Sequence, residues 1–502
     1  MLKRVLNARV SDVLSHPTPL EEAPLLSEKL DMPVFLKRED LTPVFSFKLR
    51  GAYNRVARLS ASERDLGVIA ASAGNHAQGV AFACRKLGVS CQIVMPETTP
   101  MIKVQAVNRF GADVLLRGDS YSDAAAYAAE MVREHGRLLI HPFDDLEVIA
   151  GQGTIALELL QQMPPEVDLV MLPVGGGGLA AGVASVLKEV RPHVRVLGVE
   201  PEDSNAMQLS LAAGKPVELE RVGIFADGVA VRRVGDHTFG LCQQYLDGVV
   251  TVSVDEICAA IRDGFHETRT MLEPAGALAL AGLKRVRDGR AAVSSTGAVC
   301  VLSGANVAFS RFGYIGERAE VGEDREAILA VTIPERRGEF LDFCRVIGEV
   351  GITEFNYRLS SREFAQIFVG LETGSSPASH RIINALRGRG YTVVDLSQDE
   401  VAKTHIRHMV GGRSSLVENE VLFDFEFPER PGAALEFLLS LSDRWNVSLF
   451  HYRNHGAAFG RVLCGMEVPC AQREEVKLTL DELGFSYRNV SDSPSVPFIT
   501  GI

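Results

Sequence analysis

Three features are scarce in this chain, and each scarcity excludes a class of protein. The eight cysteines lie apart and none forms a C-x-x-C pair, which argues against a zinc site or a redox dithiol and favours buried free thiols in a reducing compartment. No apolar run is long enough to span a membrane, and the opening MLKRVLNARV lacks the apolar core of a signal peptide. We therefore expect a cytoplasmic protein with no membrane-bound part.

Positive charge is also in short supply. The net charge is -12 and the pI is near 5.6, which argues against nucleic acid or an anionic membrane as a main partner. The chain has 502 residues, too many for one domain, and its apolar fraction of 46% is ample for large buried cores. The length predicts about three domains.

Short apolar runs alternate with helical stretches from about residue 30 to residue 310. The runs predict buried strands at 34–40, 67–73, 91–96, 112–118, 138–143, 168–174, 195–201, 249–254 and 298–304. Helical spacing appears between them, as in 79–88 and 154–163. This rhythm is typical of an α/β fold, in which helices cover both faces of a parallel sheet. Several strands end in glycine-rich turns, where such sheets place their ligands.

An internal repeat begins after a polar stretch at 316–326. IPERRGEFLDF (333–343) matches FPERPGAALEF (427–437), ITEFNYR (352–358) matches VSLFHYR (447–453), and IFVGLE (367–372) matches VLCGME (462–467). The offset is 94 residues at the first match and 95 at the later two, so one residue was inserted between them. The repeat predicts two tandem modules, each built as strand, helix, strand, strand.

Lys48 lies in SFKLRGAYN (46–54), between the apolar residues Phe47 and Leu49. A lysine in such a setting is either a surface cation whose stem is buried or a functional amine. A desolvated amine has a lowered pKa and can form a Schiff base with a carbonyl. The local sequence does not decide between the two.

The motif SAGNHAQG (72–79) stands between a predicted strand and a predicted helix. Ser72, Ala73 and Gly74 are small enough for a ligand to approach, and the N–H groups at the helix start could receive a carboxylate. The amide of Asn75 could hold a phenolate oxygen. The alternatives are a tight turn with Asn75 in a left-handed conformation, and a purely structural role for His76.

Four consecutive glycines occur in PVGGGGLAAGV (173–183), between a strand and a helix. Glycine lets successive N–H groups converge on one point, and the helix dipole behind them favours a phosphate. The Walker loop is excluded because no Lys-Ser/Thr follows the glycines. Close helix–strand packing is the alternative explanation of the run.

A serine, Ser303, follows another predicted strand in VLSGANVAF (301–309). Its hydroxyl either faces a ligand or caps a following helix. Local sequence gives the two roles similar weight.

Taken together and in this order, these motifs resemble the fold-type-II pyridoxal-phosphate enzymes, the tryptophan-synthase β-subunit superfamily. Within it they look like the threonine/serine dehydratases, over residues 5 to 320. The tandem modules resemble the ACT-like regulatory domain that accompanies threonine dehydratases. The resemblance implies an α/β catalytic domain at 1–320 with a small lobe at about 41–140, followed by α+β ACT-like modules at 327–399 and 420–494.

The resemblance also implies a role for each motif. Lys48 would hold pyridoxal 5'-phosphate covalently and later move protons, Asn75 would bond the cofactor's ring oxygen, and Ser303 would face its pyridine nitrogen. The cofactor phosphate would lie on Gly175, Gly176, Gly177, Gly178 and Leu179. The substrate carboxylate would be held by the loop that contains the catalytic candidate Ser72, with Gly74 and His76.

The activity implied is the conversion of L-threonine to 2-oxobutanoate and ammonia, the first step of isoleucine biosynthesis. The resemblance also implies a homotetramer that isoleucine inhibits, and valine is the other candidate effector.

Tyr357 and Tyr452 occupy matching positions in the two modules and are followed by Arg358 and Arg453. An aromatic wall beside a cation could hold an amino acid. Interface packing of the tyrosines and solvated arginines are the alternative.

Other enzymes of the superfamily are competing interpretations: serine dehydratase, serine racemase, threonine synthase and cysteine synthase. A catalytically inactive amino-acid sensor is a further alternative. Racemases of this kind bind a divalent ion through acids that follow the strand at 195–201. Glu200, Glu202 and Asp203 lie nearby, but surface acids are the commoner explanation, and we predict no required metal.

Overall fold

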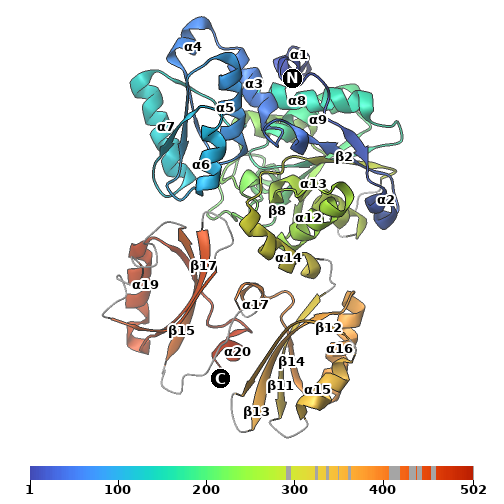
Figure 1. Ribbon diagram of the computed structural model, residues 1–502, viewed down its shortest axis with the longest axis vertical. Coiled ribbons are helices and arrows are strands. Elements are labelled where there is room, and N and C mark those ends of the chain that lie inside the picture. The colour runs from blue at the N-terminus through green and yellow to red at the C-terminus, as the bar shows by residue number, and fades with distance from the viewer. Residues whose placement is uncertain are drawn as a thin grey trace. The chain divides into compact units, whose positions relative to one another are not determined.

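The computed structural model describes residues 1–289, 295–322, 326–334, 339–348, 350–359, 363–405, 419–428, 437, 444–453 and 459–500. The chain divides into two compact units, Met1–Phe309 and Ser310–Ile502. Figure 1 shows their helices and strands and labels many of them.

A six-stranded sheet forms the larger lobe of the first unit, in the order β1-β2-β10-β7-β8-β9. β1 is antiparallel to β2, and every other neighbouring pair is parallel. All five residues of β7 and of β10 are buried, as expected for central strands covered on both faces. The strands are β1 (Leu20–Glu22), β2 (Val34–Arg38), β7 (Leu169–Pro173), β8 (Arg195–Pro201), β9 (Gly248–Val252) and β10 (Ala298–Leu302).

A parallel four-stranded sheet of order β5-β4-β3-β6 forms the smaller lobe. Its strands are β3 (Val68–Ala71), β4 (Cys91–Met95), β5 (Asp113–Leu116) and β6 (Leu138–Leu139). Every apolar run between 34 and 304 therefore contains a strand as predicted, but β5, β6 and most of β9 are not fully buried. Most are shorter than the run, because the last residues of each run belong to the turn that follows. The run at 138–143 differs most, since only its first two residues are strand.

Helices surround both sheets, as Figure 1 shows. Ser60, Ser120 and Ser253 each begin a helix through a capping box, which satisfies N–H groups that have no partner within the helix. Across the described ranges, no helix combines the length and apolar character needed to cross a membrane. The helices of the first unit are α1 (Leu2–Leu6), η1 (Arg9–Asp12), α2 (Pro24–Leu30), η2 (Glu39–Leu41), α3 (Lys48–Ala57), α4 (Ala61–Leu66), α5 (Asn75–Leu87), α6 (Met101–Asn108), α7 (Tyr121–His135), α8 (Leu146–Gln162), α9 (Gly178–Val190), α10 (Ala206–Ala213), η3 (Asp227–Val229), α11 (Asp236–Tyr245), α12 (Val254–Thr268) and α13 (Pro274–Arg287).

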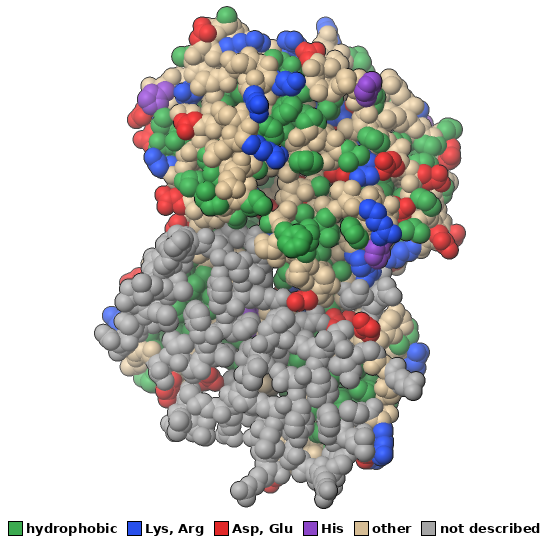
Figure 2. Space-filling model, viewed as in Figure 1, with side chains coloured by type: hydrophobic (Ala, Val, Ile, Leu, Met, Phe, Trp, Pro, Cys, Tyr) green, Lys and Arg blue, Asp and Glu red, His purple; other side chains and the backbone are tan. Residues whose placement is uncertain are grey.

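The surface of the first unit carries charges of both signs. On the face that Figure 2 shows, acidic and basic side chains are interspersed with apolar and polar ones. Mixed charge of this kind is typical of the outer surface of a globular domain. The face therefore agrees with the sequence in giving no sign of a broad basic surface for nucleic acid.

Helices α3, α8 and α9 touch backbone to backbone through glycines. A Cβ on Gly151 of α8 would lie 2.5 Å from the carbonyl oxygen of Arg50 in α3. A Cβ on Gly182 of α9 would lie 2.5 Å from the carbonyl oxygen of Ile149 in α8. Helix α8 therefore holds α3 and α9 at short, fixed distances. This matters for the site, because α3 begins at Lys48 and α9 begins at Gly178.

The second unit contains two antiparallel four-stranded sheets of the same topology, β12-β13-β11-β14 and β16-β17-β15-β18. This is the split β-α-β order of ferredoxin-like modules. The repeat is visible in the pairing: Tyr357 lies opposite Ile367 and Tyr452 lies opposite Val462, with one bulge at the same place in each module. The elements are η4 (Phe309–Arg311), α14 (Phe312–Val321), β11 (Glu326–Pro334), α15 (Glu339–Ile347), β12 (Gly351–Leu359), β13 (Phe364–Glu372), α16 (Ser376–Gly388), β14 (Thr392–Asp395), α17 (Glu400–Thr404), β15 (Glu420–Pro428), β16 (Asn446–Arg453), β17 (Phe459–Glu467), η6 (Cys470–Gln472), α19 (Arg473–Leu483), β18 (Ser486–Asn489) and α20 (Val496–Thr500).

The predicted module of strand, helix, strand, strand was incomplete. Each copy continues with a further helix and strand, α16 with β14 and α19 with β18. The repeat did not reveal them because SPASHRIINALRG and REEVKLTLDEL have little sequence in common. The helix predicted after FPER in the second copy lies almost entirely outside the described residues.

We predict that Gly151→Ala lowers the unfolding midpoint. The added methyl group meets the Arg50 carbonyl at 2.5 Å, and overpacking of this kind costs about 1–3 kcal/mol. Thermal unfolding followed by circular dichroism measures the effect. The control is Gly240→Ala on α11, where no described atom lies within 4 Å of the added group. A Gly151→Ala protein as stable as the control would show that α8 and α3 do not need this contact.

Candidate active site

The carboxyl ends of three neighbouring strands meet at one edge of the larger sheet. Lys48 follows β2 by way of η2, Ser303 follows β10, and a glycine loop follows β7. Asn75 joins them from the smaller lobe. One cavity brings the four segments together, and it is lined by Phe47, Lys48, Asn75, Phe143, Pro173, Gly175, Gly176, Gly177, Gly178, Leu179, Gly228, Val229, Glu273, Ala275 and Ser303.

Backbone pairing fixes the start of α3 beside the end of β10. The N–H of Phe47 donates to the carbonyl of Ser303 at 3.1 Å, and the N–H of Ala305 donates to the carbonyl of Phe45 at 2.9 Å. Phe45 adopts a φ of 55°, a conformation that is unfavourable for a bulky side chain. The chain bends sharply here, so that Lys48 lies next to the segment that carries Ser303.

The amine of Lys48 is enclosed by protein. Its Nζ donates to the carbonyl of Pro142 at 2.9 Å, and the residue keeps some accessible surface because it lines the cavity. Burial lowers the pKa of Lys48 to about 8, against the raising effect of the Glu273 carboxylate. A large fraction of the amine is therefore neutral near pH 8. Of the two interpretations of Lys48, this geometry favours the functional amine over the solvated cation.

Close neighbours or the backbone conformation disfavour a side chain at each glycine of the loop. A Cβ on Gly175 would lie 2.8 Å from the Cα of Val229, and one on Gly176 would lie 2.2 Å from the ring of Phe143. Gly177 has a φ of 93°, which disfavours any other residue. Gly178 begins α9, whose first N–H groups and dipole favour an anion. Close packing and an anion site are therefore compatible explanations of the run.

Asn75 belongs to a hydrogen-bonded group with two residues that the sequence analysis did not single out. Its Nδ2 donates to Glu273 at 2.5 Å, and its Oδ1 accepts from Asn306 at 2.7 Å. Asn75 is the first residue of α5 and is not left-handed, so the tight-turn alternative does not apply. Glu273 is buried beside Pro274, the first residue of α13. An acid directly before proline in an otherwise apolar stretch was the signal that could have identified it.

The loop before α5 is the partly open side of the site. Residues 72–74 are only partly buried, and the Oγ of Ser72 accepts from the N–H of Gly74 at 3.2 Å. No described atom lies within 4 Å of a Cβ built on Gly74. The first N–H groups of α5 have no partner within the helix, which leaves them able to bind an anion.

His76 makes a hydrogen bond of the kind expected of a histidine with a structural role. Its Nε2 lies 2.8 Å from the carbonyl of Ile140, while Nδ1 has no hydrogen-bond partner within the described part of the chain. Burial, followed by the charge of Lys48, lowers the pKa of His76 to about 3. The imidazole is therefore neutral, with Nε2 as its donor, and Nδ1 can accept a hydrogen bond.

Ser303 faces the cavity from the end of β10. It is buried, and its Oγ donates to the carbonyl of Ala275 at 3.3 Å. Residues 304–308 are not helical, and the next helix begins at Phe309. Ser303 is therefore not a helix cap.

The sequence analysis assigned residues 140–143 to a strand, but they form a turn after β6. This turn contacts residues of the site. It supplies the Pro142 carbonyl to Lys48 and the Phe143 ring to Gly176. The carboxylate of Asp144 accepts the N–H groups at the start of α11. Thr238 of that helix donates to the carbonyl of Gly176 at 2.6 Å, so the turn and α11 together support the glycine loop.

The acids considered as metal ligands have other partners. The carboxylate of Glu200 accepts from the N–H groups of Met207 and Gln208 at 2.9 and 2.8 Å. Burial raises the pKa of Glu200 to about 8. Glu202 pairs with Arg285 at 2.8 Å. Within the ranges that the structure describes, no three His, Cys, Asp or Glu side chains are grouped as a metal site would require.

The candidate effector residues lie on matching edge strands of the two modules. Tyr357 and Arg358 are on β12, and Tyr452 and Arg453 are on β16. Their backbones have equivalent register positions. Their side chains lie outside the described structure.

Comparison with known proteins supports both parts of the chain. Residues 13–304 match the family of pyridoxal-phosphate dependent enzymes, and residues 317–406 and 411–499 match the C-terminal regulatory domain of threonine dehydratase. The chain is 53% identical to the biosynthetic L-threonine dehydratase IlvA of Burkholderia multivorans, over 98% of each protein. It is 50% identical to that of Escherichia coli, over 99% of this chain and 96% of the relative.

Solved structures resemble nearly two thirds of the chain. The processed form of threonine deaminase isoform 2 from Solanum lycopersicum is 46% identical, with a TM-score of 0.62 over 64% of this chain and 87% of that one. A serine racemase from Dictyostelium discoideum is 31% identical, with a TM-score of 0.56 over 62% of this chain and 99% of that one.

We predict that Glu273→Gln lowers the pKa of Lys48 below its present value of about 8, because the negative charge that raises this pKa is removed. The neutral amine then persists to lower pH. The pH dependence of Lys48 acetylation by acetic anhydride, followed by mass spectrometry in cofactor-free protein, measures the shift. Glu130→Gln on the exposed face of α7 is the control. An unchanged profile in Glu273→Gln would contradict the electrostatic role.

Proposed function

This chain belongs to the threonine dehydratases among the pyridoxal-phosphate-dependent enzymes, and on that basis we propose that it converts L-threonine to 2-oxobutanoate and ammonia at the cavity around Lys48. It is a lyase with a biosynthetic role. One observation carries the assignment of the site: Lys48, Asn75, the glycine loop and Ser303, which lie far apart in the sequence, line a single cavity.

The residues present fit pyridoxal phosphate. The glycine loop and the N-terminus of α9 offer backbone N–H groups to its phosphate, and the Lys48 amine, partly neutral near pH 8, would bond its aldehyde carbon. Asn75 would donate to its ring oxygen, and Ser303 would face its ring nitrogen. A hydroxyl is neutral and, unlike a carboxylate, does not keep that nitrogen protonated.

When bound, pyridoxal phosphate accepts negative charge from the α-carbon of the amino acid. Once the amino group of threonine has displaced Lys48 from the cofactor, the freed Nζ would act as the base and take the α-proton, since a neutral amine with a pKa near the working pH is an efficient proton acceptor. The Pro142 carbonyl, 2.9 Å from Nζ, orients the amine whenever it is free. Loss of the β-hydroxyl follows from the charge at the α-carbon.

The loop before α5 would bind the substrate carboxylate. Three features support this placement of the carboxylate: the open space at Gly74, the N–H groups at the helix start that have no partner within the helix, and the Ser72 hydroxyl. The Nδ1 of His76 can accept one further hydrogen bond. We place the carboxylate here because the helix dipole favours an anion at this point.

Serine-acting enzymes of the superfamily are the second candidate, and the solved serine racemase shares the fold. Threonine is favoured because the full-length relatives named as threonine dehydratases are 53% and 50% identical and share both parts of the chain. The serine racemase aligns with only 62% of the chain. It does not account for the tandem modules.

We predict that Lys48→Ala loses about 10²–10⁴-fold or more in turnover, since both the covalent link and the base are removed. The Schiff-base absorbance should vanish as well. Release of 2-oxobutanoate from threonine and the visible spectrum are the two measurements. Lys86→Ala, at an exposed position of α5, should behave as wild type. A fully active Lys48→Ala enzyme would refute the assignment.

The tandem modules are a regulatory domain, and we propose isoleucine as its inhibitor, with valine as the alternative effector. Tyr357, Arg358, Tyr452 and Arg453 are the residues we propose to contact it, from equivalent positions of β12 and β16. The two modules share one hydrophobic cluster, which includes Ile328 and Leu422, so a ligand on one module can affect the other.

Ion pairs connect the modules to α14, a helix at the start of the second unit. Arg318 of α14 binds Glu400 of α17 through two bonds of 2.6 and 2.7 Å. His405, just beyond α17, lies 3.3 Å from the buried Asp424 on β15. A signal from the second module therefore has a continuous path to α14. Typical couplings of this kind are about 1–3 kcal/mol.

We predict that a chain ended near residue 320 remains active but is no longer inhibited by isoleucine, because the proposed binding residues are removed. A further solved threonine deaminase, 39% identical, aligns over 99% of its own length with only 61% of this chain, which supports an independent catalytic part. Turnover of threonine with and without isoleucine measures the effect. Inhibition that persists in the shortened chain would defeat the regulatory proposal.

We also propose the division and setting of the molecule. The catalytic domain would comprise 1–320 with a small lobe at about 41–140, and the modules 327–399 and 420–494. The homotetramer is proposed from the family resemblance alone. The cytoplasm is proposed because the described cysteines are free thiols and mostly buried, as in a reducing compartment.

A further inference from the structure

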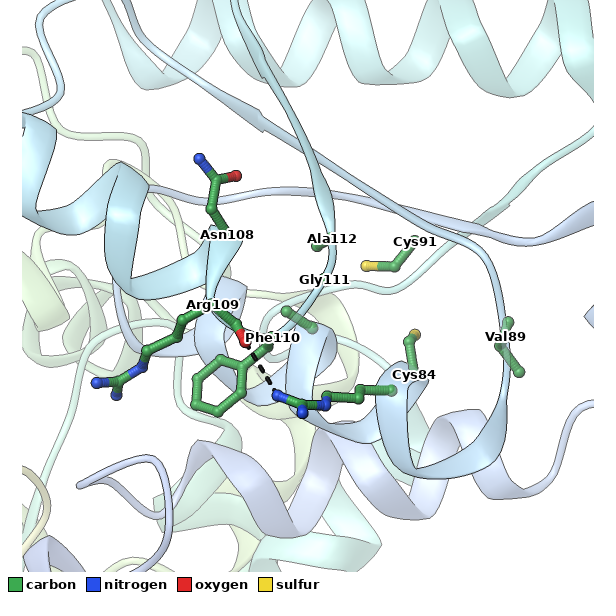
Figure 3. A pocket seen from close by; sticks show the side chains of 10 residues that line it. Cys84, Val89, Cys91, Asn108, Arg109, Phe110, Gly111 and Ala112 are labelled. Atoms are coloured by element: carbon green, nitrogen blue, oxygen red, sulfur yellow. Dashed lines mark hydrogen bonds between the residues drawn. The ribbon is translucent and has the colours of Figure 1, made fainter.

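A second cavity lies in the smaller lobe, outside the proposed active site. Its volume is about 400 Å³. It is formed by the end of α5, the turn into β4, and the segment between α6 and β5, and Figure 3 shows it from close by. Its lining residues are Ala81, Cys84, Arg85, Val89, Cys91, Asn108, Arg109, Phe110, Gly111 and Ala112.

Two cysteines meet in this cavity. Cys84 comes from α5 and Cys91 begins β4, and their thiols are close enough for a hydrogen bond; Figure 3 shows both side chains at the same wall. Cys242 and Cys300, in contrast, each contact a backbone carbonyl. The sequence argued against a redox dithiol because no C-x-x-C pair occurs. The fold nevertheless brings together two cysteines seven positions apart, one on a helix and one at the start of the next strand.

Cations surround the mouth of the cavity. Arg85 and Arg109 are exposed, and Arg85 Nη1 donates to the carbonyl of Arg109 at 2.9 Å. The Arg109 guanidinium lies 4.9 Å from the centre of the Phe110 ring. Two positive charges beside an opening of this size favour a small anionic ligand.

We propose that Cys84 and Cys91 are a redox site that the disulfide of an anionic low-molecular-weight thiol oxidises, and that this oxidation lowers turnover at the active site. The arginines attract the carboxylates of the incoming disulfide. The cavity gives that disulfide access to Cys91, the more exposed of the two.

The reaction balances in two exchanges. The Cys91 thiolate attacks one sulfur of the incoming disulfide, forms a mixed disulfide and expels the first thiolate. Cys84 then loses its proton to water, and its sulfur attacks the sulfur of Cys91 and expels the second thiolate. Two protein thiols become one disulfide, and the incoming disulfide is reduced to two thiols.

The order of attack follows from the environment of each thiol. Cys91 is 7% exposed and Cys84 is 1% exposed. The hydrogen bond with Cys91 and burial both raise the pKa of the Cys84 thiol, so Cys84 is the poorer first nucleophile. Once the mixed disulfide has formed on Cys91, the sulfur that Cys84 attacks lies next to the Cys84 thiol.

Helix α5 connects this cavity to the active site. The helix that carries Cys84 near its end begins with Asn75 and His76. In between, a Cβ on Gly79 would lie 3.1 Å from the carbonyl of Lys48, so α5 packs directly against the start of α3. A disulfide bond of about 2.05 Å is shorter than a thiol hydrogen bond. Oxidation therefore draws the end of α5 toward β4 and shifts the residues at its start.

The experiment is oxidation of the holoenzyme with glutathione disulfide, followed by mass-spectrometric mapping. We expect a cross-link between the peptides that carry Cys84 and Cys91, reversed by dithiothreitol. Exposed Cys470 serves as an internal control and should form only a mixed disulfide with glutathione. Modification of Cys470 while Cys84 and Cys91 remain thiols would overturn the redox site, whether or not the proposed catalytic function holds.

Variants separate the steps. Cys84→Ala should stop at a mixed disulfide on Cys91, whereas Cys91→Ala should leave Cys84 unmodified. Arg109→Gln should slow the reaction with glutathione disulfide but not with cystamine, whose charge is positive. Stable modification of Cys84 in the Cys91→Ala protein would contradict the order of attack.

Turnover tests the coupling. Threonine turnover should fall as the cross-link forms, recover on reduction, and stay unchanged in Cys84→Ala under the same treatment. A complete cross-link with unchanged turnover would refute the link through α5.

Discussion

A buried ion cluster at the start of α3 is the constraint on which the site depends. The Arg50 guanidinium is fully buried and binds Glu39 through two bonds of 2.8 Å and Glu158 through bonds of 2.6 and 2.9 Å. Lys37 adds a second cation, 2.6 Å from Glu158. The two positive and two negative charges are balanced, and breaking one buried partner costs about 3–5 kcal/mol. The cluster therefore holds β2, α3 and α8 in one arrangement.

This arrangement places two chemically distinct groups within reach of one ligand. Lys48 stands two residues before Arg50, and Gly178 begins the helix that packs on α8 through Gly182. The amine and the phosphate loop are thus positioned by the same helix, α8, which itself contributes nothing to the cavity lining. The other side of the site comes from the smaller sheet, through Asn75 and the partly open loop before it. The hydrogen bond from Asn75 to Glu273 connects the smaller lobe to the start of α13.

Motifs with strong local chemistry were recognisable in sequence, while their supports were not. Lys48 stands out as a cation between apolar residues, and the glycine run and Ser303 stand out because each follows an apolar strand. Glu273, Pro142 and Asp144 act through partners 92 to 225 residues away, and no local pattern encodes such distances. The cysteines show the same limit: the spacing of Cys84 and Cys91 matches no motif, and only the packing of α5 on β4 makes them a pair.

The apolar runs determined the strands of both lobes, and the internal repeat determined that two similar modules follow. Both patterns can be read from the sequence because each is a local property of the chain. The resemblance of the motifs determined the family. The tertiary structure alone decided that Ser303 is not a cap and that the pKa of Lys48 falls to about 8. It also decided that His76 is neutral, with Nδ1 unpartnered among the described residues, and that the glycine loop packs against Phe143 and Thr238. These properties arise from desolvation and from contacts between distant segments, and both exist only once the chain has folded.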